Sequence, residues 1–279
     1  MKKLAVILAA LMLCGCTSSD KAESRADDSS GFMSILGEAF KETVDSLIFS
    51  NDYSQLSTEK HGYGQGVQLD NENRPAGAID FNNVYSKYNA TAIGSADKKE
   101  IRLTFDQGYE NGFTAGILDT LKEKCVKATF FVLDDYARRN PELVRRMIDE
   151  GHTVGNHSVS HYSMPTLTPS ECVEEIMGLH KYIKDEFGYE MTEFRPPMGE
   201  FSEQSLAVTN DCGYRTVLWS YAYADWDVNA QPEPASALKK LTGALHSGAI
   251  YLLHSVSETN AKILGDFIDE ALAQGYTFI

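Results

Sequence analysis

From Lys99 onward the sequence alternates between short apolar runs typical of strands and longer amphipathic runs typical of helices. The strand-like runs lie at 100–106, 128–132, 152–155, 192–195, 214–220, 248–254 and 276–279. The helical patterns lie at 113–124, 141–150, 169–187, 202–211, 235–246 and 257–274. Strands that alternate with helices pair in parallel through right-handed crossovers. Because no glycine-rich dinucleotide motif is present, about seven such units favour an α/β barrel over an open sheet.

The N-terminal residues have the pattern of a targeting signal. Two lysines precede an unbroken apolar run over 4–13, which is shorter than the about 20 residues that span a bilayer but suits a secretory signal. The run Leu13-Cys14-Gly15-Cys16 resembles the lipobox of bacterial lipoproteins. We therefore expect residues 1–15 to be removed and Cys16 to carry a lipid anchor in the cell membrane. A plain signal peptide is the alternative.

Three further segments follow this signal. Residues 16–31, rich in Ser, Asp, Ala and Lys, are typical of a flexible tether. Residues 32–97 form a helical and loop-rich lead-in, with an amphipathic helix predicted over 32–49 and a short helix near 81–88. Residues 98–279 show no internal boundary and are predicted to form one catalytic domain.

Charge and cysteine content narrow the function further. The net charge is −15, and −17 without residues 1–15, which argues against nucleic-acid binding. The cysteines beyond the signal, Cys125, Cys172 and Cys212, fit no zinc or disulfide spacing and are expected to be buried small apolar residues. We expect an extracytoplasmic monomer.

Polar side chains follow five of the predicted strands. They are Asp106 and Gln107, His157 and His161, Arg195, Asp225, and finally His254. The carboxyl ends of parallel barrel strands face one mouth, so these groups should converge there. The convergence favours a chemical role for Asp106 over the alternative that it only caps a turn.

Two of these groups have a local pattern of their own. His157 and His161 are four residues apart, which on a turn or short helix places both imidazoles on one side, as in a metal site. Two solvent-facing loop histidines are the alternative. Arg195 precedes two prolines that stiffen its backbone, and a fixed guanidinium keeps a nearby carboxylate ionised. An ordinary surface arginine is the alternative there.

The motifs together resemble a known family. They are TFDQG at 104–108, HSVSH at 157–161, RPPMG at 195–199, ADWD at 224–227 and YLLH at 251–254. In this order they resemble the polysaccharide deacetylases of carbohydrate esterase family four, the NodB-homology domain. The resemblance implies a distorted (β/α) barrel of about seven strands. It also implies hydrolysis of the acetamide of an N-acetylated amino sugar, assisted by a divalent metal, commonly zinc.

The resemblance also implies a role for each group. Asp106 would be the general base that takes a proton from the attacking water, with Arg195 holding it. His254 would be the general acid that protonates the leaving amine, and Asp225 would tune it. An amide needs an activated water, a polarised carbonyl and a protonated leaving group, and this set supplies them.

Metal and substrate contacts follow in the same way. His157 and His161 would bind the metal, but Gln107 stands where most of the family has a second Asp, and a neutral amide oxygen binds a dication less well. Substrate contacts are expected at Tyr109, Pro197, Met198, Gly199 and Trp226. The backbone N–H near Met198 would help to hold the oxyanion. Trp226 would form a groove wall against sugar rings, or else belong to the core.

The run Gly108-Tyr109-Glu110-Asn111-Gly112 resembles one branch of the family, the N-acetylmuramic acid deacetylases that prepare muramic δ-lactam. The chain departs from this branch in having Gln rather than Asn at 107 and in its lipid-anchor signal. The sequence therefore predicts a deacetylase of muramic residues in peptidoglycan. An N-acetylglucosamine or chitooligosaccharide deacetylase and a catalytically silent glycan-binding module are the alternatives.

Overall fold

The computed structural model describes residue 46 and residues 51–279. The predicted signal, Cys16, the tether and all of the helix predicted over 32–49 except Ser46 lie outside the described residues. The chain divides into two compact units, residues 1–43 and 44–279. The fold and the site below belong to the second unit. Within the described residues, no helix combines the length and apolar character needed to cross a membrane.

Eleven strands and eight α-helices longer than one turn build the part of the second unit that the structure describes. The strands are β1 (His61–Gly62), β2 (Ala90–Thr91), β3 (Glu100–Gln107), β4 (Ala128–Val132), β5 (Thr153–Asn156), β6 (Glu193–Phe194), β7 (Glu200–Phe201), β8 (Arg215–Val217), β9 (Tyr221–Ala222), β10 (Ala249–His254) and β11 (Thr277–Phe278). The helices are α2 (Ala76–Tyr85), α3 (Thr114–Glu123), α4 (Asp134–Arg139), α5 (Pro141–Asp149), α6 (Pro169–Phe187), α7 (Glu203–Asp211), α8 (Pro234–Gly243) and α9 (Glu258–Ala273). Short 3-10 helices are η2 (Ser86–Tyr88), η3 (Met164–Thr166) and η4 (Pro197–Gly199).

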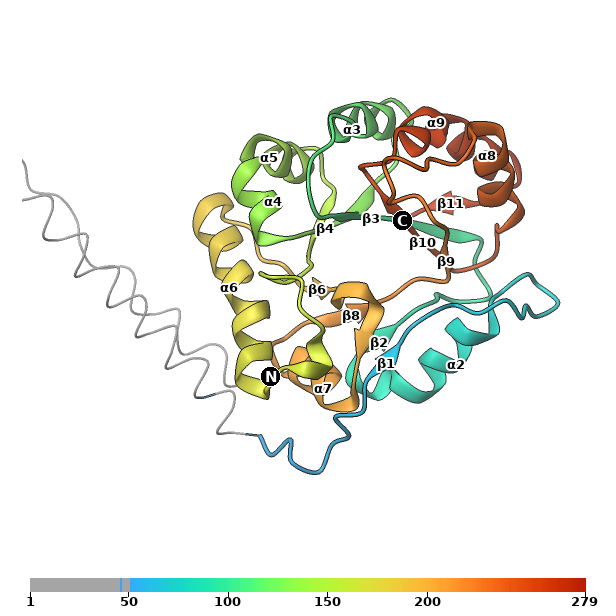
Figure 1. Cartoon of the computed structure of the whole chain (residues 1–279). Coiled ribbons are helices and arrows are strands. Elements are labelled where there is room, and N and C mark those ends of the chain that lie inside the picture. The colour runs from blue at the N-terminus through green and yellow to red at the C-terminus, as the bar shows by residue number, and fades with distance from the viewer. Residues whose placement is uncertain (1–45, 47–50) are drawn as a thin grey trace, which may run out of the picture. The chain divides into compact units, whose positions relative to one another are not determined.

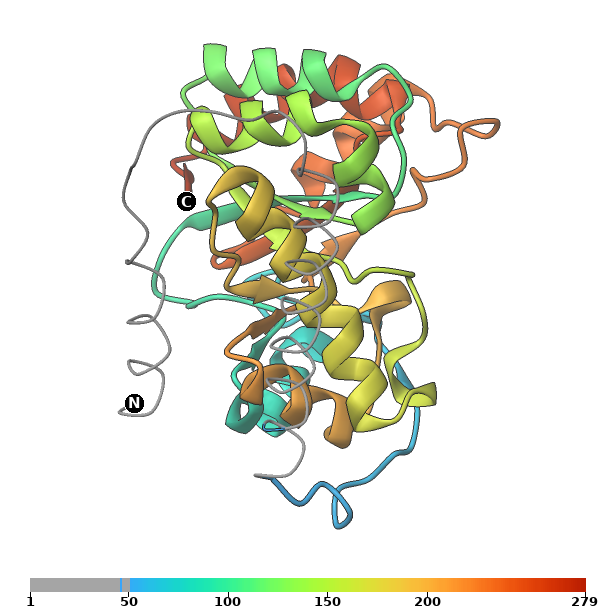
Figure 2. The ribbon, with the colours of Figure 1, turned by 90° about the vertical axis from the view of Figure 1, so that its left-hand side faces the viewer.

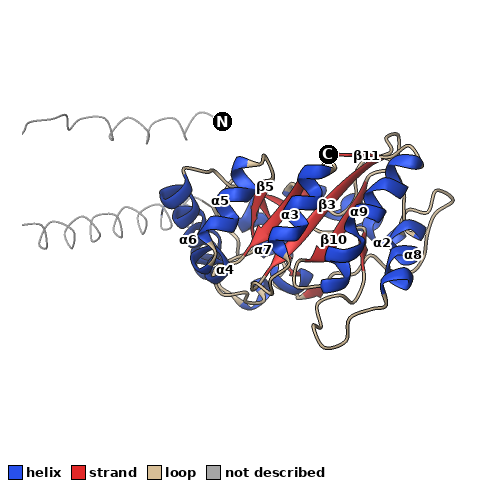
Figure 3. Cartoon of the chain, turned by 90° about the horizontal axis from the view of Figure 1, so that it is seen from above, coloured by secondary structure: helices blue, strands red, loops and turns tan. Residues whose placement is uncertain are grey.

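The main sheet is parallel and curled, with the strand order β2-β8-β6-β5-β4-β3-β10-β9 and β11 beside β3. One stretch of chain joins its two sides, because β8 pairs with β6 while β9, shortly after it, pairs with β10. Helices lie outside the strands (Figures 1 and 3). In side view α3 and α9 lie at one end and α2 and α7 at the other (Figure 2). The predicted α/β fold with a barrel-like parallel sheet is confirmed.

The strand predicted over 214–220 is two strands in the structure. The N–H of Leu218 donates to the Thr91 carbonyl of β2, whereas the N–H of Ser220 donates to the Ile250 carbonyl of β10. These two strands lie towards opposite ends of the strand order. The chain therefore changes partners between these residues, and β8 ends before β9 begins. The two-residue strands β1, β2 and β7 and the six-residue helix α4 have no equivalent in the sequence prediction, since such short elements show no hydrophobic period.

The described part of the lead-in packs within this unit. β2 pairs with β8, and β1 pairs antiparallel with β7. The Tyr63 hydroxyl donates to the Trp219 carbonyl at 2.5 Å, and the Trp219 indole N–H donates to Gln65 at 3.0 Å. The helix expected near 81–88 is present as α2 and η2, which begin earlier at Ala76.

The cysteine prediction is only partly right. Cys172 is buried and Cys212 is half-buried, but Cys125 is exposed. Cys125 lies in the turn that ends α3, with a positive φ of 55°. The turn directs the Cys125 side chain towards solvent. The prediction of burial rested on residue type alone, and cysteine is usually buried.

Candidate active site

Asp106, near the end of β3, is paired with Arg195 from the segment after β6. Nη1 of Arg195 donates to Asp106 Oδ1 at 2.7 Å, and the guanidinium is fully buried. Burial alone would raise the pKa of Asp106, but the adjacent guanidinium and two neighbouring imidazoles outweigh it and lower this pKa below its usual range. The carboxylate is therefore ionised at neutral pH.

The remaining donors of Arg195 fix the guanidinium. Nε donates to the Val217 carbonyl at 3.0 Å and Nη2 to the Leu218 carbonyl at 3.2 Å. The Phe131 ring lies beneath the guanidinium, 4.2 Å from its carbon to the ring centroid. Gly155 makes room for this ring, since a Cβ there would lie 2.4 Å from it. The fixed guanidinium thus holds Oδ1 of Asp106, whereas Oδ2 makes no hydrogen bond with the arginine.

His157 and His161 lie together, as predicted, and of the two predicted settings it is the turn, not the short helix, that carries them. Ser158 and His161 have left-handed backbones, with φ of 77° and 58°. Asn156 accepts from the N–H of Ser158, and the Ser158 hydroxyl accepts from the N–H of His161. This local turn brings the two ring centroids to 5.0 Å.

The His157 ring is oriented as metal-binding imidazoles usually are. Its Nδ1 lies 2.9 Å from the Arg195 carbonyl, which can only accept, so Nδ1 carries the proton and the Nε2 lone pair is free. Nε2 lies 3.6 Å from Asp106 Oδ2. Burial lowers the pKa of His157 to about 4 and also lowers that of His161. Both rings are neutral at neutral pH, the form that binds metals.

The side chain of Gln107 is buried, and the two polar atoms of its amide have different surroundings. Its amide nitrogen donates to the Ser255 hydroxyl at 2.5 Å, while its Oε1 has no hydrogen-bond partner among the described residues. An unpartnered buried oxygen is the kind of atom that a cation satisfies. No group of three or more His, Cys, Asp or Glu side chains in residues 51–279 is arranged to hold a metal. The paired imidazoles of His157 and His161 are donors of the kind that bind a divalent ion, and the Gln107 oxygen is a neutral amide donor.

His254, at the end of β10, is held by Asp225. Its Nδ1 lies 2.7 Å from Asp225 Oδ1, and its backbone N–H donates to Oδ2 at 2.9 Å. Burial alone would lower the pKa of His254, but the bond to Asp225 and the charges of both nearby carboxylates raise it above its usual value. His254 is opposite Asp106 in the ladder between β10 and β3. An ionised carboxylate and a histidine that favours its proton thus stand side by side.

Two further residues, Asn260 and Ser255, hold the groups of the site in place. Asn260 donates to Asp225 Oδ2 at 2.6 Å and accepts from the Tyr223 hydroxyl. Ser255 receives the amide of Gln107. The partners of both residues, Asp225 and Gln107, are distant in the sequence.

Four large side chains stand around the mouth on loops that follow the strands. Tyr109, Tyr162, Met198 and Trp226 are each more than half exposed. Trp226 lies beside His254, with ring centroids 6.4 Å apart, so of the two interpretations the exposed one fits. Pro197 and Gly199 are buried beneath the rim, and Gly199 packs on Trp219, where a Cβ would lie 2.7 Å away. Tyr162 has no counterpart in the sequence prediction.

The remaining histidines are engaged elsewhere. His61 stacks on Phe201, and His246 hydrogen-bonds Ser220. His152 receives the N–H of Ala128, and His180 contacts the Tyr214 hydroxyl. These four histidines are packing or surface residues.

The sequence and the fold of the chain are similar to those of known proteins. A model of the family described as polysaccharide deacetylase matches residues 93–217. The peptidoglycan-N-acetylmuramic acid deacetylase PdaA of Bacillus subtilis is 41% identical over 209 residues, 75% of this chain and 80% of that one. An uncharacterized 30.6 kDa protein of Geobacillus stearothermophilus is 43% identical over 83% of this chain and 89% of its own. The solved structure of B. subtilis PdaA, a family 4 carbohydrate esterase, has a TM-score of 0.76 at 39% identity and covers 80% of this chain and 95% of that one.

Proposed function

The chain belongs to the polysaccharide deacetylase family, and on this premise we propose that it removes the acetyl group of N-acetylmuramic acid residues in peptidoglycan. The observation that carries the proposal is the pairing of Asp106 with His254 across two adjacent strands, each with its own charged partner. The relative named for muramic acid, together with the Gly108–Gly112 run, supports the choice of sugar.

Asp106 is the base of the proposed reaction. Arg195 holds Oδ1, so Oδ2 is the oxygen that accepts a proton from the attacking water. The lowered pKa keeps the carboxylate ready at neutral pH, although a base with a low pKa is a weak one. The water must therefore be acidified by another group at the same mouth.

A divalent ion such as zinc, when bound, would supply this acidification and polarise the acetyl carbonyl. His157 and His161 would hold it through neutral imidazoles, and the Oε1 of Gln107 is the third donor available. Because an amide oxygen carries no charge, we expect weaker metal binding than with a carboxylate at this position.

His254 is the acid that protonates the leaving amine. Asp225 fixes its Nδ1, so the opposite nitrogen, Nε2, is the one that faces the substrate. The backbone N–H of Met198, in a left-handed turn with φ of 58°, bonds to no other described group and is available to the oxyanion. The exposed rim of Tyr109, Tyr162 and Trp226 gives sugar rings a stacking surface.

The proposed place of action is outside the cell membrane. The signal-like residues 1–15 and Cys16 support lipid anchoring, with residues 16–31 as a tether that lets the domain reach glycan strands. We propose that the protein acts as a monomer and binds no nucleic acid, in line with its net charge of −15.

The test is acetate release from peptidoglycan whose stem peptides have been removed, with zinc supplied and with zinc chelated. Acetate that depends on the metal, and a muramic product able to close a lactam with loss of water, are the expected results. No acetate from any such glycan would contradict the proposal.

Two other functions remain to be separated by that test. Acetate from glucosamine units, with no lactam closure, would identify an N-acetylglucosamine deacetylase. Gln107 is the one feature that favours a silent glycan-binding module, and glycan binding without turnover in the metal-loaded protein would identify it.

A further inference from the structure

The segment that carries His254 leaves the sheet directly after it. The ladder between β3 and β10 pairs Asp106 with His254 and ends there. The next residues, 255–257, have no ladder partner on β3, although Gln107 still pairs with β4. Side chains must therefore hold this segment, here called the acid loop, against the strand of the base.

Two amide side chains make that connection. The buried Gln107 amide donates to the Ser255 hydroxyl at 2.5 Å, and Asn111 donates to the Val256 carbonyl at 2.9 Å. Gln107 and Ser255 are almost completely excluded from solvent, at 0% and 1% exposure, so water cannot replace the bond if it is lost. Glu110, between them, accepts from the N–H of Gly112 at 2.6 Å and fixes the turn that presents Asn111.

The chemistry of position 107 matters to this connection. An aspartate is shorter by a methylene group and has no N–H to donate, so it could not make the same bond from the same backbone. A glutamine can donate to Ser255 through its nitrogen and still keep its oxygen free for another contact. The replacement at 107 thus has a consequence for the acid loop that is independent of metal affinity.

We propose that Gln107 is a positioning residue, which through Ser255 and with the help of Asn111 sets the place of His254 relative to Asp106. This inference rests on the proposed function, since it assigns Gln107 a task within that reaction. It predicts that the bond to Ser255 affects the chemical step and leaves substrate and metal binding unchanged.

The experiment compares Ser255→Ala, Gln107→Leu and the double variant in the full chain, with Ser255→Thr as the rescue. In Ser255→Ala we expect kcat to fall about 10-fold or more, because small misplacements of catalytic groups are costly. KM and the zinc affinity measured by chelator competition should stay within about twofold. Ser255→Thr restores the hydroxyl and should recover most of kcat. The double variant should be no slower than Gln107→Leu, since the two residues act as one pair.

A matched control is Ser220→Ala, which removes another fully buried hydroxyl that accepts the N–H of Ile250 and contacts His246. It should retain kcat. Hydrogen exchange at residues 255–257 gives a readout that needs no turnover. We expect faster exchange in Ser255→Ala and Gln107→Leu and unchanged exchange in Ser220→Ala.

Three results would overturn the inference: an unchanged kcat in Ser255→Ala, a zinc affinity that falls in parallel with kcat in that variant, or unchanged exchange at 255–257. An inactive wild-type protein would contradict the proposed function instead, and the exchange data would still decide the role of Gln107.

Discussion

The interior of the barrel holds two arginine–carboxylate pairs between the same two parts of the chain, with opposite polarity. At the carboxyl end β3 contributes Asp106 and the segment after β6 contributes Arg195. At the amino end β3 contributes Arg102 and β6 contributes Glu193. The pairs are alike in chemistry, so the difference in their surroundings shows what turns a buried ion pair into a reactive site.

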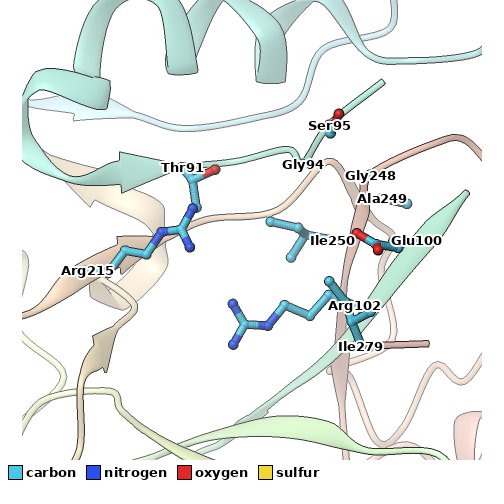
Figure 4. A pocket seen from close by; sticks show the side chains of 10 residues that line it. All are labelled: Thr91, Gly94, Ser95, Glu100, Arg102, Arg215, Gly248, Ala249, Ile250 and Ile279. Atoms are coloured by element: carbon cyan, nitrogen blue, oxygen red, sulfur yellow. The ribbon is translucent and has the colours of Figure 1, made fainter. Parts of the chain in front are cut away.

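At the amino end the pair is closed on itself. The guanidinium of Arg102 contacts the Glu193 carboxylate and the Thr129 hydroxyl. Arg102 also lines a cavity of about 90 Å³ with Arg215 and Glu100 (Figure 4). The residues that line this cavity include no histidine, which is consistent with a structural role for this end.

At the carboxyl end the pair is left open on one side. The other N–H groups of Arg195 donate to backbone carbonyls. Asp106 Oδ2 therefore has no hydrogen bond to Arg195 and lies beside His157 at the mouth. His254, with its raised pKa, stands opposite. A small hydrophobic cluster of Phe131, Val217 and Ile250 lies within the barrel. The pair that we propose to be reactive is therefore the one whose carboxylate keeps an oxygen free of the arginine, beside two histidines.

The largest effect should come from removing the negative charge of the Asp106–Arg195 pair. Asp106→Asn keeps the shape and can still accept from Arg195, but it cannot take a proton from water. We expect acetate release to fall about 10²–10⁴-fold, the usual contribution of a general base, while the circular dichroism spectrum stays native. Activity near wild type would remove Asp106 from the base role.

A smaller effect should come from the partner of the acid. Asp225 raises the pKa of His254, so Asp225→Asn should lower that pKa, and His254 would lose its proton at a lower pH. The alkaline limb of the pH profile of kcat/KM should therefore move to lower pH. An unmoved limb would show that another group is the acid. The acid limb, where Asp106 and the imidazoles gain protons, should change less.

Removing the negative charge of the Arg102–Glu193 pair should affect the stability of the fold and not turnover. Glu193→Gln leaves the buried Arg102 with a weaker partner and should destabilise the fold by about 1–3 kcal/mol, read as a lower melting temperature. Acetate release below that temperature should remain close to wild type. A loss of turnover as large as that of Asp106→Asn would break the distinction between the two ends.

The smallest effect should come from the rim. Tyr162→Ala removes an exposed ring without touching either pair. We expect a loss of about 0.5–1.5 kcal/mol in substrate binding, seen as a higher KM with kcat unchanged. A lower kcat at constant KM would instead place Tyr162 in the chemistry.

Much of the open end is predictable from the sequence, because strand ends in a parallel sheet meet at one edge. Asp106, Arg195 and His254 lie together for that reason. The histidine pair and its turn are also predictable, but the two left-handed residues in that turn, Ser158 and His161, are not.

What the sequence could not provide are contacts between distant side chains. Asn260 and Ser255 become meaningful only once Asp225 and Gln107 are placed against them. The closed pair of Arg102 and Glu193 is hidden for the same reason. Local patterns specify elements and their ends, whereas long-range partners depend on how the elements pack.

The most direct test of the proposed hydrolysis is the reaction in water enriched in heavy oxygen, with zinc supplied. The substrate is muramic oligomers whose reducing ends have been reduced to alditols, so that no anomeric oxygen can exchange with water. The account predicts that the released acetate carries one heavy oxygen and that the muramic amine is freed with no label in the glycan. Heavy oxygen in the glycan, or the absence of acetate, would contradict it.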